Sequence, residues 1–247
     1  NSSQDVSCKF YSDGIIDILI QGGAYPYYTI TWDVIIEDTN YVDSVAAGWY
    51  VYTVIDTNNC QASDSVLVSE PDELVAIPTI TNVLCKGYHE GAINLTVSGG
   101  TPAYSYTWTG PNGFTRTTKD INGLASGTYI VFITDQKGCV FQGSYSVSEP
   151  ASVINFYIDS TNVSCNGFND GAIDLTVIGG TPYAGTPSYV YSWSNAETTE
   201  DISNLVAGTY TVTIFDENEC DTSTVITLTE PALLTSFISG INLDCYQ

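Results

Sequence analysis

The sequence predicts an all-β protein made of tandem immunoglobulin-like β-sandwich repeats arranged end to end. A block of about 80 residues recurs, and its first cysteine falls at positions 8, 85, 165 and 245 of the 247 residues. Apolar and polar residues alternate, as in Ile93, Leu95 and Val97, which is typical of a strand with one buried face. Turn residues interrupt every apolar run, and no stretch keeps a helical period. Such repetition indicates an array of small domains.

The repeat gives the domain boundaries. We expect a first immunoglobulin-like repeat at residues 1–71, with its first strand truncated, a second at 72–150 and a third at 151–231. Residues 232–247 would be the first strand of a fourth repeat, and we expect the chain to be a segment of a longer polypeptide. A Glu-Pro pair closes each repeat, because proline cannot extend a ladder. A core of about 80 residues is marginal alone, so a covalent link is expected.

The strands within each repeat can be placed in order. A strand over 93–97 or 173–177 ends in Gly-Gly-Thr-Pro, and the next strand ends on a tryptophan: Tyr28–Trp32, Tyr104–Trp108, Tyr189–Trp193. A Gly-x-Tyr step then enters a long strand that ends in Asp56, Asp135 or Asp216, and a tight turn leads to the second cysteine: Cys60, Cys139, Cys220. This order resembles the buried tryptophan and tyrosine corner of immunoglobulin-like sandwiches, and predicts six or seven strands per repeat.

Two segments carry a resemblance to a known family. Cys85 to Pro102 returns almost unchanged as Cys165 to Pro182, followed by Tyr-x-Trp, Gly-Thr-Tyr, a second cysteine and Glu-Pro. This pattern resembles the SprB repeat, found in tandem in giant surface adhesins of gliding Bacteroidota. The resemblance implies type IX secretion, display on the exterior of the outer membrane, and a part in gliding motility. The first repeat departs from the pattern, since Trp49 replaces the threonine of Gly-Thr-Tyr.

The charge balance restricts the partners. The chain has 5 basic and 28 acidic residues, a net charge of -23, which disfavours nucleic acid and anionic lipid. Charged residues make up only 13%, so the polar surface consists mainly of Thr, Ser, Asn and Tyr, as suits a secreted protein near glycans. We expect the main partners to be neighbouring repeats of the same polypeptide, with surface glycans or other chains of a filament as further partners.

Seven cysteines without a zinc-like spacing indicate disulfides and a compartment outside the cytosol. Two schemes compete. The within-repeat scheme joins Cys8–Cys60, Cys85–Cys139 and Cys165–Cys220, with Cys245 awaiting a partner. The staggered scheme joins Cys8–Cys139 and Cys85–Cys220. Seven strands would place the two cysteines of a repeat at opposite ends, about 25 Å apart. The tyrosine corner suggests seven strands, and this favours the staggered scheme, although both remain open.

The sequence does not indicate catalysis. His89 is the only histidine, it precedes a Glu-Gly turn, and no hydrolase, metalloprotease or phosphate-loop motif is present. We therefore expect no enzyme and no cofactor, with calcium as the alternative: the acids that would bind it at turns are Asp13, Asp56, Asp170 and Asp216. The simpler interpretation is that Asp, Asn and Gly make these turns.

Some surface positions are candidates for contact or modification. On the long tyrosine strand, the face opposite the core carries Trp49 and Val51 in the first repeat and Ile130 and Phe132 in the second, which could contact glycans or another chain. The alternative is that they lie at a sheet edge. Ser44 and Ser65, each between Asp and Val, resemble the O-glycosylation signal of Bacteroidota.

These observations predict a structural stalk or filament segment of a large secreted adhesin that serves attachment and gliding. Repetition would give weak, multivalent contacts rather than one deep site. Two alternatives stay open: a carbohydrate-binding module array of a secreted enzyme, and a subunit of a homopolymeric surface fibre. In the fibre, the strand at 232–247 would complete a neighbouring chain.

Overall fold

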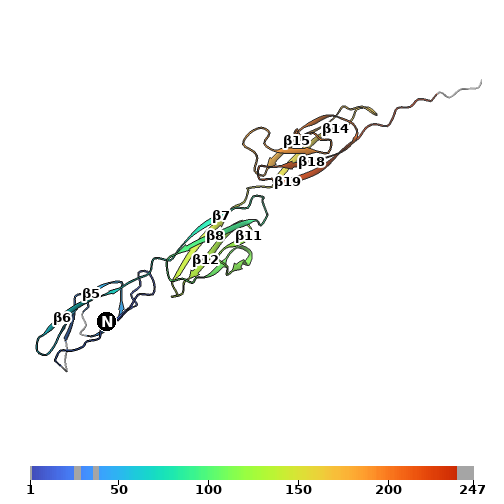
Figure 1. Cartoon of the computed structure of the whole chain (residues 1–247). Helices are drawn as coiled ribbons and strands as arrows, with labels where there is room; N and C mark the ends of the chain where they lie inside the picture. Colours follow the sequence, from blue (N-terminus) through green and yellow to red (C-terminus); the bar gives the residue numbers. More distant parts are fainter. Residues whose placement is uncertain (1, 25–28, 36–38, 238–247) are drawn as a thin grey trace, which may run out of the picture. The chain divides into compact units, whose positions relative to one another are not determined.

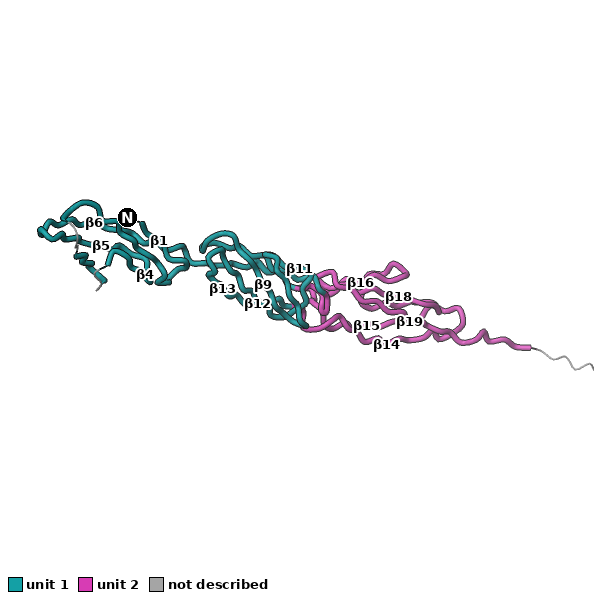
Figure 2. Tube along the Cα trace, turned by 90° about the horizontal axis from the view of Figure 1, so that it is seen from below, with its two compact units in different colours: residues 1–82, 89–148 teal, residues 83–88, 149–247 magenta. Residues whose placement is uncertain are grey.

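The computed structural model describes residues 2–24, 29–35 and 39–237, and within them the chain is built from β-strands (Figure 1). The helical content of this part is one 3-10 turn, Pro111–Gly113, so it holds no helix of the length and apolar character needed to cross a membrane. The chain divides into two compact units, residues 1–82 with 89–148 and residues 83–88 with 149–247 (Figure 2). The first holds most of repeats 1 and 2, and the second holds repeat 3 with a short loop of repeat 2.

Each repeat folds into two antiparallel sheets, as the alternating sequence predicts. In repeat 1 the sheets are β1(Ser2–Gln4)-β2(Gly14–Asp17)-β4(Tyr41–Val45) and β3(Thr29–Trp32)-β5(Gly48–Ile55)-β6(Gln61–Val68). In repeat 2 they are β11(Ile121–Leu124)-β8(Gly91–Ser98)-β7(Val75–Thr81) and β10(Thr115–Arg116)-β9(Ser105–Thr109)-β12(Gly127–Thr134)-β13(Val140–Val147). In repeat 3 they are β14(Ile154–Thr161)-β15(Gly171–Gly179)-β17(Ile202–Leu205) and β16(Val190–Trp193)-β18(Gly208–Phe215)-β19(Asp221–Leu228). Tyr28, expected to open β3, lies outside the described residues.

The core of each repeat forms around the predicted tryptophan and tyrosine. Trp108 is fully buried, and its indole N–H donates to the carbonyl of Thr118 at 3.0 Å. The Tyr129 hydroxyl donates to the carbonyl of Ala125, four residues earlier, at 3.0 Å, which is the geometry of a tyrosine corner. Repeats 1 and 3 have the same two bonds, which supports the immunoglobulin-like assignment independently in each repeat.

The six or seven strands predicted for each repeat are present in the part of the chain that the structure describes. Among the described residues, repeat 2 has seven strands, one of them the two-residue β10, while repeats 1 and 3 have six. A single strand, β4 or β17, separates the tryptophan strand from the tyrosine strand in those two repeats. The seven-strand alternative, which favoured the staggered scheme, therefore holds for repeat 2, and the six-strand alternative holds for the described residues of repeats 1 and 3.

The two cysteines of a repeat nevertheless lie at opposite ends of it. In repeat 3, Cys165 precedes β15, whereas the turn before Cys220 lies beside Thr181, just after β15, where the Glu217 N–H donates to the Thr181 carbonyl at 2.9 Å. The nine residues of β15 span about 30 Å at strand geometry. Counting strands missed this because the irregular segment 194–201 carries the chain back along the sandwich without forming a strand.

The first strand of repeat 1 is short. β1 has three residues and pairs with β2 from Ser2↔Asp17 to Gln4↔Ile15, whereas β7 and β14 have seven and eight residues. Pairing of β7 with β8 continues to Val75↔Ser98 at the far end. In repeat 1 the segment after β2, residues 18–21, therefore lacks a neighbouring first strand among the described residues.

Candidate functional site

Two disulfides join successive repeats. Cys8 bonds Cys139 within the first unit, and Cys85 bonds Cys220 within the second, each with 5.6 Å between the two Cα atoms. The partners lie 131 and 135 residues apart in the sequence. The structure therefore has the staggered scheme and not the within-repeat one. Cys245 lies outside the described residues.

The first cysteine of each repeat lies in a loop that we call the Cys loop: residues 6–11, 83–88 and 163–168. In all three, the third residue after the cysteine donates its N–H to the cysteine carbonyl, at 3.1, 3.0 and 3.0 Å. The second residue after the cysteine has a left-handed backbone, with φ of +84° at Gly87 and +81° at Gly167. Phe10 occupies this position in repeat 1 with φ of +64°, where an L side chain is strained.

A glutamate holds each Cys loop in place. The N–H of this left-handed residue donates to the carboxylate of the Glu-Pro pair that closes the same repeat: Phe10 to Glu70 at 3.0 Å, Gly87 to Glu149 at 2.8 Å, Gly167 to Glu230 at 2.6 Å. Lys9 also pairs with Glu70, and that hydrogen bond lowers the pKa of Glu70. The Glu-Pro pair predicts only a repeat boundary, so this role of the glutamate was not predicted. The available signal was the glutamate at the same place in all three repeats.

The second cysteine of each repeat follows a turn that we call the Asp turn: residues 56–60, 135–139 and 216–220. The Asp135 carboxylate accepts hydrogen bonds from the backbone N–H groups of Thr101, Lys137 and Cys139 at 2.7, 2.8 and 2.9 Å. Asp216 accepts three equivalent bonds and is fully buried. A Cβ atom at Gly100 would lie 2.7 Å from the Asp135 carboxylate, so the Gly-Gly pair permits this close approach.

In the Asp turns of repeats 1 and 2, hydrogen bonding lowers the pKa of the aspartate. Burial raises the pKa of Asp135, but the hydrogen bonds from Thr101 and Cys139 outweigh it, and the net pKa is lowered. Hydrogen bonds from the N–H groups of Ala24 and Cys60 lower the pKa of Asp56 in the same way. In each Asp turn the N–H of the second cysteine donates to the aspartate carboxylate, which fixes the backbone of the cysteine.

Residues of the linker after Glu-Pro complete both junctions. In the first unit, Leu74 lines a cavity of about 250 Å³ with Cys8, Gly100 and Cys139, and it is buried. In the second unit, the buried Ile154 has the same place in a cavity of about 210 Å³. The Asn218 amide also donates to the Leu84 carbonyl of the Cys loop at 3.0 Å. A junction thus consists of a Cys loop and linker meeting the Gly-Gly pair and Asp turn of the next repeat.

The structure does not bring the predicted calcium ligands together. Asp13 and Asp170 accept hydrogen bonds from Ser7 and Ser164 in their own Cys loops, while Asp56 and Asp216 support Asp turns. Among the described residues, no group of three His, Cys, Asp or Glu side chains could hold one ion. These carboxylates are used in turns, as the simpler interpretation predicts.

The predicted surface positions differ in exposure. Trp49 is 64% exposed and lies opposite Leu67 of β6, with Val51 two residues along the same face. Phe132 is exposed, whereas Ile130 is half-buried. The remaining candidates are all exposed: Ser44, Ser65 and His89.

The family comparison agrees with this architecture. The family model for the SprB repeat matches residues 77–113 and 158–198. These two stretches are similar to the SprB repeat. They include part of the first strand, the Cys loop and the tryptophan strand of repeats 2 and 3. Repeat 1 lies outside the matched residues, although its Cys loop has the same hydrogen bond. No curated protein matches the chain.

Several solved structures of tandem immunoglobulin domains are similar in part. The eight N-terminal domains of Down Syndrome Cell Adhesion Molecule are 12% identical with a TM-score of 0.42, covering 83% of this chain and 33% of that one. Drosophila OTK extracellular domains 3–5 are 13% identical with a TM-score of 0.34, covering 83% and 86%. The insect immune protein hemolin is 14% identical with a TM-score of 0.34, covering 88% and 71%. The chain spans about a third of the first structure's length.

Proposed function

We propose that this chain is a stalk segment of a large secreted cell-surface adhesin. The observation that carries the proposal is the pair of disulfides that fasten each repeat to the next, because such bonds bypass the linkers between repeats. A chain that only had to fold its separate sandwiches would gain as much from bonds within each repeat. Disulfides persist in oxidising surroundings, which supports a place outside the cell.

Length in solution and ligand binding together test this role. We expect small-angle scattering of the oxidised chain to give a maximum dimension of roughly 100 Å, the span of three repeats at strand geometry. We also expect no retention on a broad glycan array. A compact scattering envelope would contradict the stalk.

The exposed Trp49 supports a second candidate, carbohydrate binding by repeat 1. Array binding that Trp49→Ala abolishes, with Phe132→Ala as the matched control on repeat 2, would favour this candidate over a purely mechanical role. Binding unchanged by either substitution would place any glycan contact elsewhere.

The SprB match supports a role in attachment and gliding, with export by type IX secretion to the exterior of the outer membrane. Deletion of the gene in the producing bacterium tests this part. We expect cells that attach and move less on a surface, and normal movement would refute the gliding role.

A further inference from the structure

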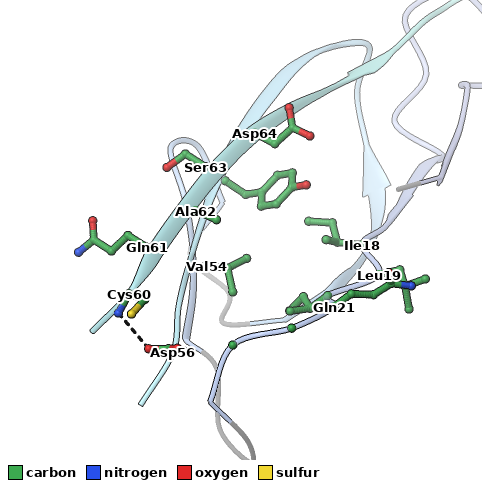
Figure 3. A pocket seen from close by; sticks show the side chains of 14 residues that line it. Ile18, Leu19, Gln21, Val54, Asp56, Cys60, Gln61, Ala62, Ser63 and Asp64 are labelled. Carbon is green, nitrogen blue, oxygen red and sulfur yellow. Dashed lines mark hydrogen bonds between the residues drawn. The ribbon is translucent and has the colours of Figure 1, made fainter. Parts of the chain in front are cut away.

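Repeat 1 has an open cavity where repeats 2 and 3 have a junction. The cavity measures about 530 Å³, and its lining includes Ile18, Ile20, Gly23, Val54, Asp56 and Cys60. Figure 3 shows Ile18 and Val54 on opposite sides of it and Cys60 at one end, with its N–H bonded to Asp56. Cys60 is exposed and unpaired.

The same positions are covered in the other two repeats. Gly100 and Cys139 of repeat 2 meet the Cys loop of repeat 1 and the linker residue Leu74. Gly180 and Cys220 of repeat 3 meet the Cys loop of repeat 2 and Ile154. In repeat 1, the described residues provide neither a Cys loop nor a linker at this place.

The acceptor half of the missing junction is already formed. Asp56 accepts hydrogen bonds from the N–H groups of Ala24, Asn58 and Cys60 at 3.0, 2.8 and 2.9 Å, the pattern found at Asp135. The backbone of Cys60 is therefore held by Asp56 in the same way as the backbone of the disulfide-bonded Cys139 is held by Asp135.

The donor half is formed at the other end of the chain. Cys165 is exposed and unpaired, yet its loop has the bonds of the two bonded loops: Gly167 to Glu230 at 2.6 Å and Phe168 to the Cys165 carbonyl at 3.0 Å. In the linker that follows Glu230, Leu234 is 96% exposed. Leu234 lies four residues after its Glu-Pro glutamate, as the buried Leu74 does.

We propose that the cavity at Cys60 is a docking site for a second copy of this chain, which inserts the Cys loop and linker of its repeat 3. Docking places Cys165 of one copy against Cys60 of the other and buries Leu234 against Ile18 and Val54. The two unpaired cysteines are then complementary halves of one junction, and copies join head to tail.

The bond forms by thiol–disulfide exchange with a small disulfide such as oxidised glutathione. The Cys60 thiolate attacks one glutathione sulfur, which gives a mixed disulfide and releases the first reduced glutathione. The Cys165 thiolate of the second copy then attacks the Cys60 sulfur and releases the second glutathione. Two thiols are oxidised, two electrons pass to glutathione disulfide, and both thiol protons leave to solvent or to the released thiolates.

The test mixes two variants in a glutathione redox buffer, both carrying Cys245→Ser. One also carries Cys60→Ser and keeps Cys165, while the other carries Cys165→Ser and keeps Cys60. We expect the mixture to give about tenfold more disulfide dimer than either variant alone, because only the mixture can form the docked pair, and tenfold corresponds to about 1.4 kcal/mol of docking energy. Mass spectrometry of the dimer should find one peptide pair, Cys60 with Cys165.

Two further variants separate docking from thiol chemistry. Leu234→Asp in the chain that keeps Cys165 should lower the dimer yield several-fold, while its Cys165 reacts with Ellman's reagent at an unchanged rate. Val225→Asp, an exposed position on β19, is the matched control and should leave the yield unchanged. Equal yields from the mixture and from each variant alone would overturn the proposal. The stalk proposal would survive that result, because it rests on the two bonds within the chain.

Discussion

The two disulfides limit how far the chain can extend when its ends are pulled. With both bonds intact, the shortest covalent path between the ends runs through residues 1–8, 85–139 and 220–247. This path contains about 88 of the chain's roughly 246 peptide links, so its full extension is about 300 Å, against about 850 Å for the reduced chain. Residues 9–84, which include strands β2–β6 of repeat 1, carry no load in the oxidised state.

Single-molecule force spectroscopy on chains tethered at both ends measures this directly. We expect reduction with dithiothreitol to add about 550 Å to the unfolded contour length. Cys220→Ser removes one bond, and the path then runs through residues 1–8 and 139–247. This variant should gain only about 90 Å before reduction.

Unpaired cysteines provide the matched control. Cys165→Ser leaves the staggered path unchanged, so its oxidised contour length should equal that of the parent chain. If the bonds were within repeats, the oxidised parent chain would have nearly the same unfolded contour length. In that scheme, however, Cys165→Ser would release a loop of about 55 residues and add about 190 Å to the contour length. A gain of that size in Cys165→Ser would refute the staggered bonds.

Four further predictions concern the supports of the junction and the core. Asp135→Asn should lower the free energy of unfolding of repeat 2 by about 2 kcal/mol in denaturant titrations, since the amide cannot accept all three backbone N–H bonds, while the exposed control Asp43→Asn should change it little. Folding lowers the pKa of Asp135 from 3.8, so its ionised carboxylate stabilises the fold fully above pH 3.8, and this stabilisation is lost as the pH falls below that value. Acid should therefore lower the melting temperature of the parent more than that of Asp135→Asn. Phe10→Gly should stabilise repeat 1 by about 0.5 kcal/mol by relieving the left-handed backbone, and a loss of that size would contradict the strain. Tyr129→Phe should cost about 1 kcal/mol through the lost bond to Ala125, and an unchanged midpoint would show that the bond contributes nothing.

Local patterns in the sequence predict the sandwiches well. Alternation over residues such as Ile93 and Leu95, which are both buried, identifies strands because successive side chains of a strand point to opposite faces. The tryptophan and tyrosine also identify their own hydrogen bonds, since both acceptors lie within ten residues. The sequence left six and seven strands as alternatives, because an irregular segment such as 194–201 takes the place of a strand and has no periodic signal.

Long-range features of the junction were harder to predict. The staggered pairing agrees with the structure, although the strand count used to favour it holds only for repeat 2. The role of Glu149 was missed because its partner, the N–H of Gly87, lies 62 residues away. The acids at 56 and 216 suit either a turn or a calcium site by residue type, and only the fold shows that backbone N–H groups occupy their oxygens.

Peptide mapping of the monomeric chain is the most direct test of disulfide bonds between successive repeats. Free thiols are alkylated at acidic pH, and the chain is digested without reduction and analysed by mass spectrometry. The structure predicts linked peptides joining Cys8 to Cys139 and Cys85 to Cys220, with alkylated Cys60 and Cys165. A peptide that links Cys8 to Cys60, or Cys85 to Cys139, would contradict the account.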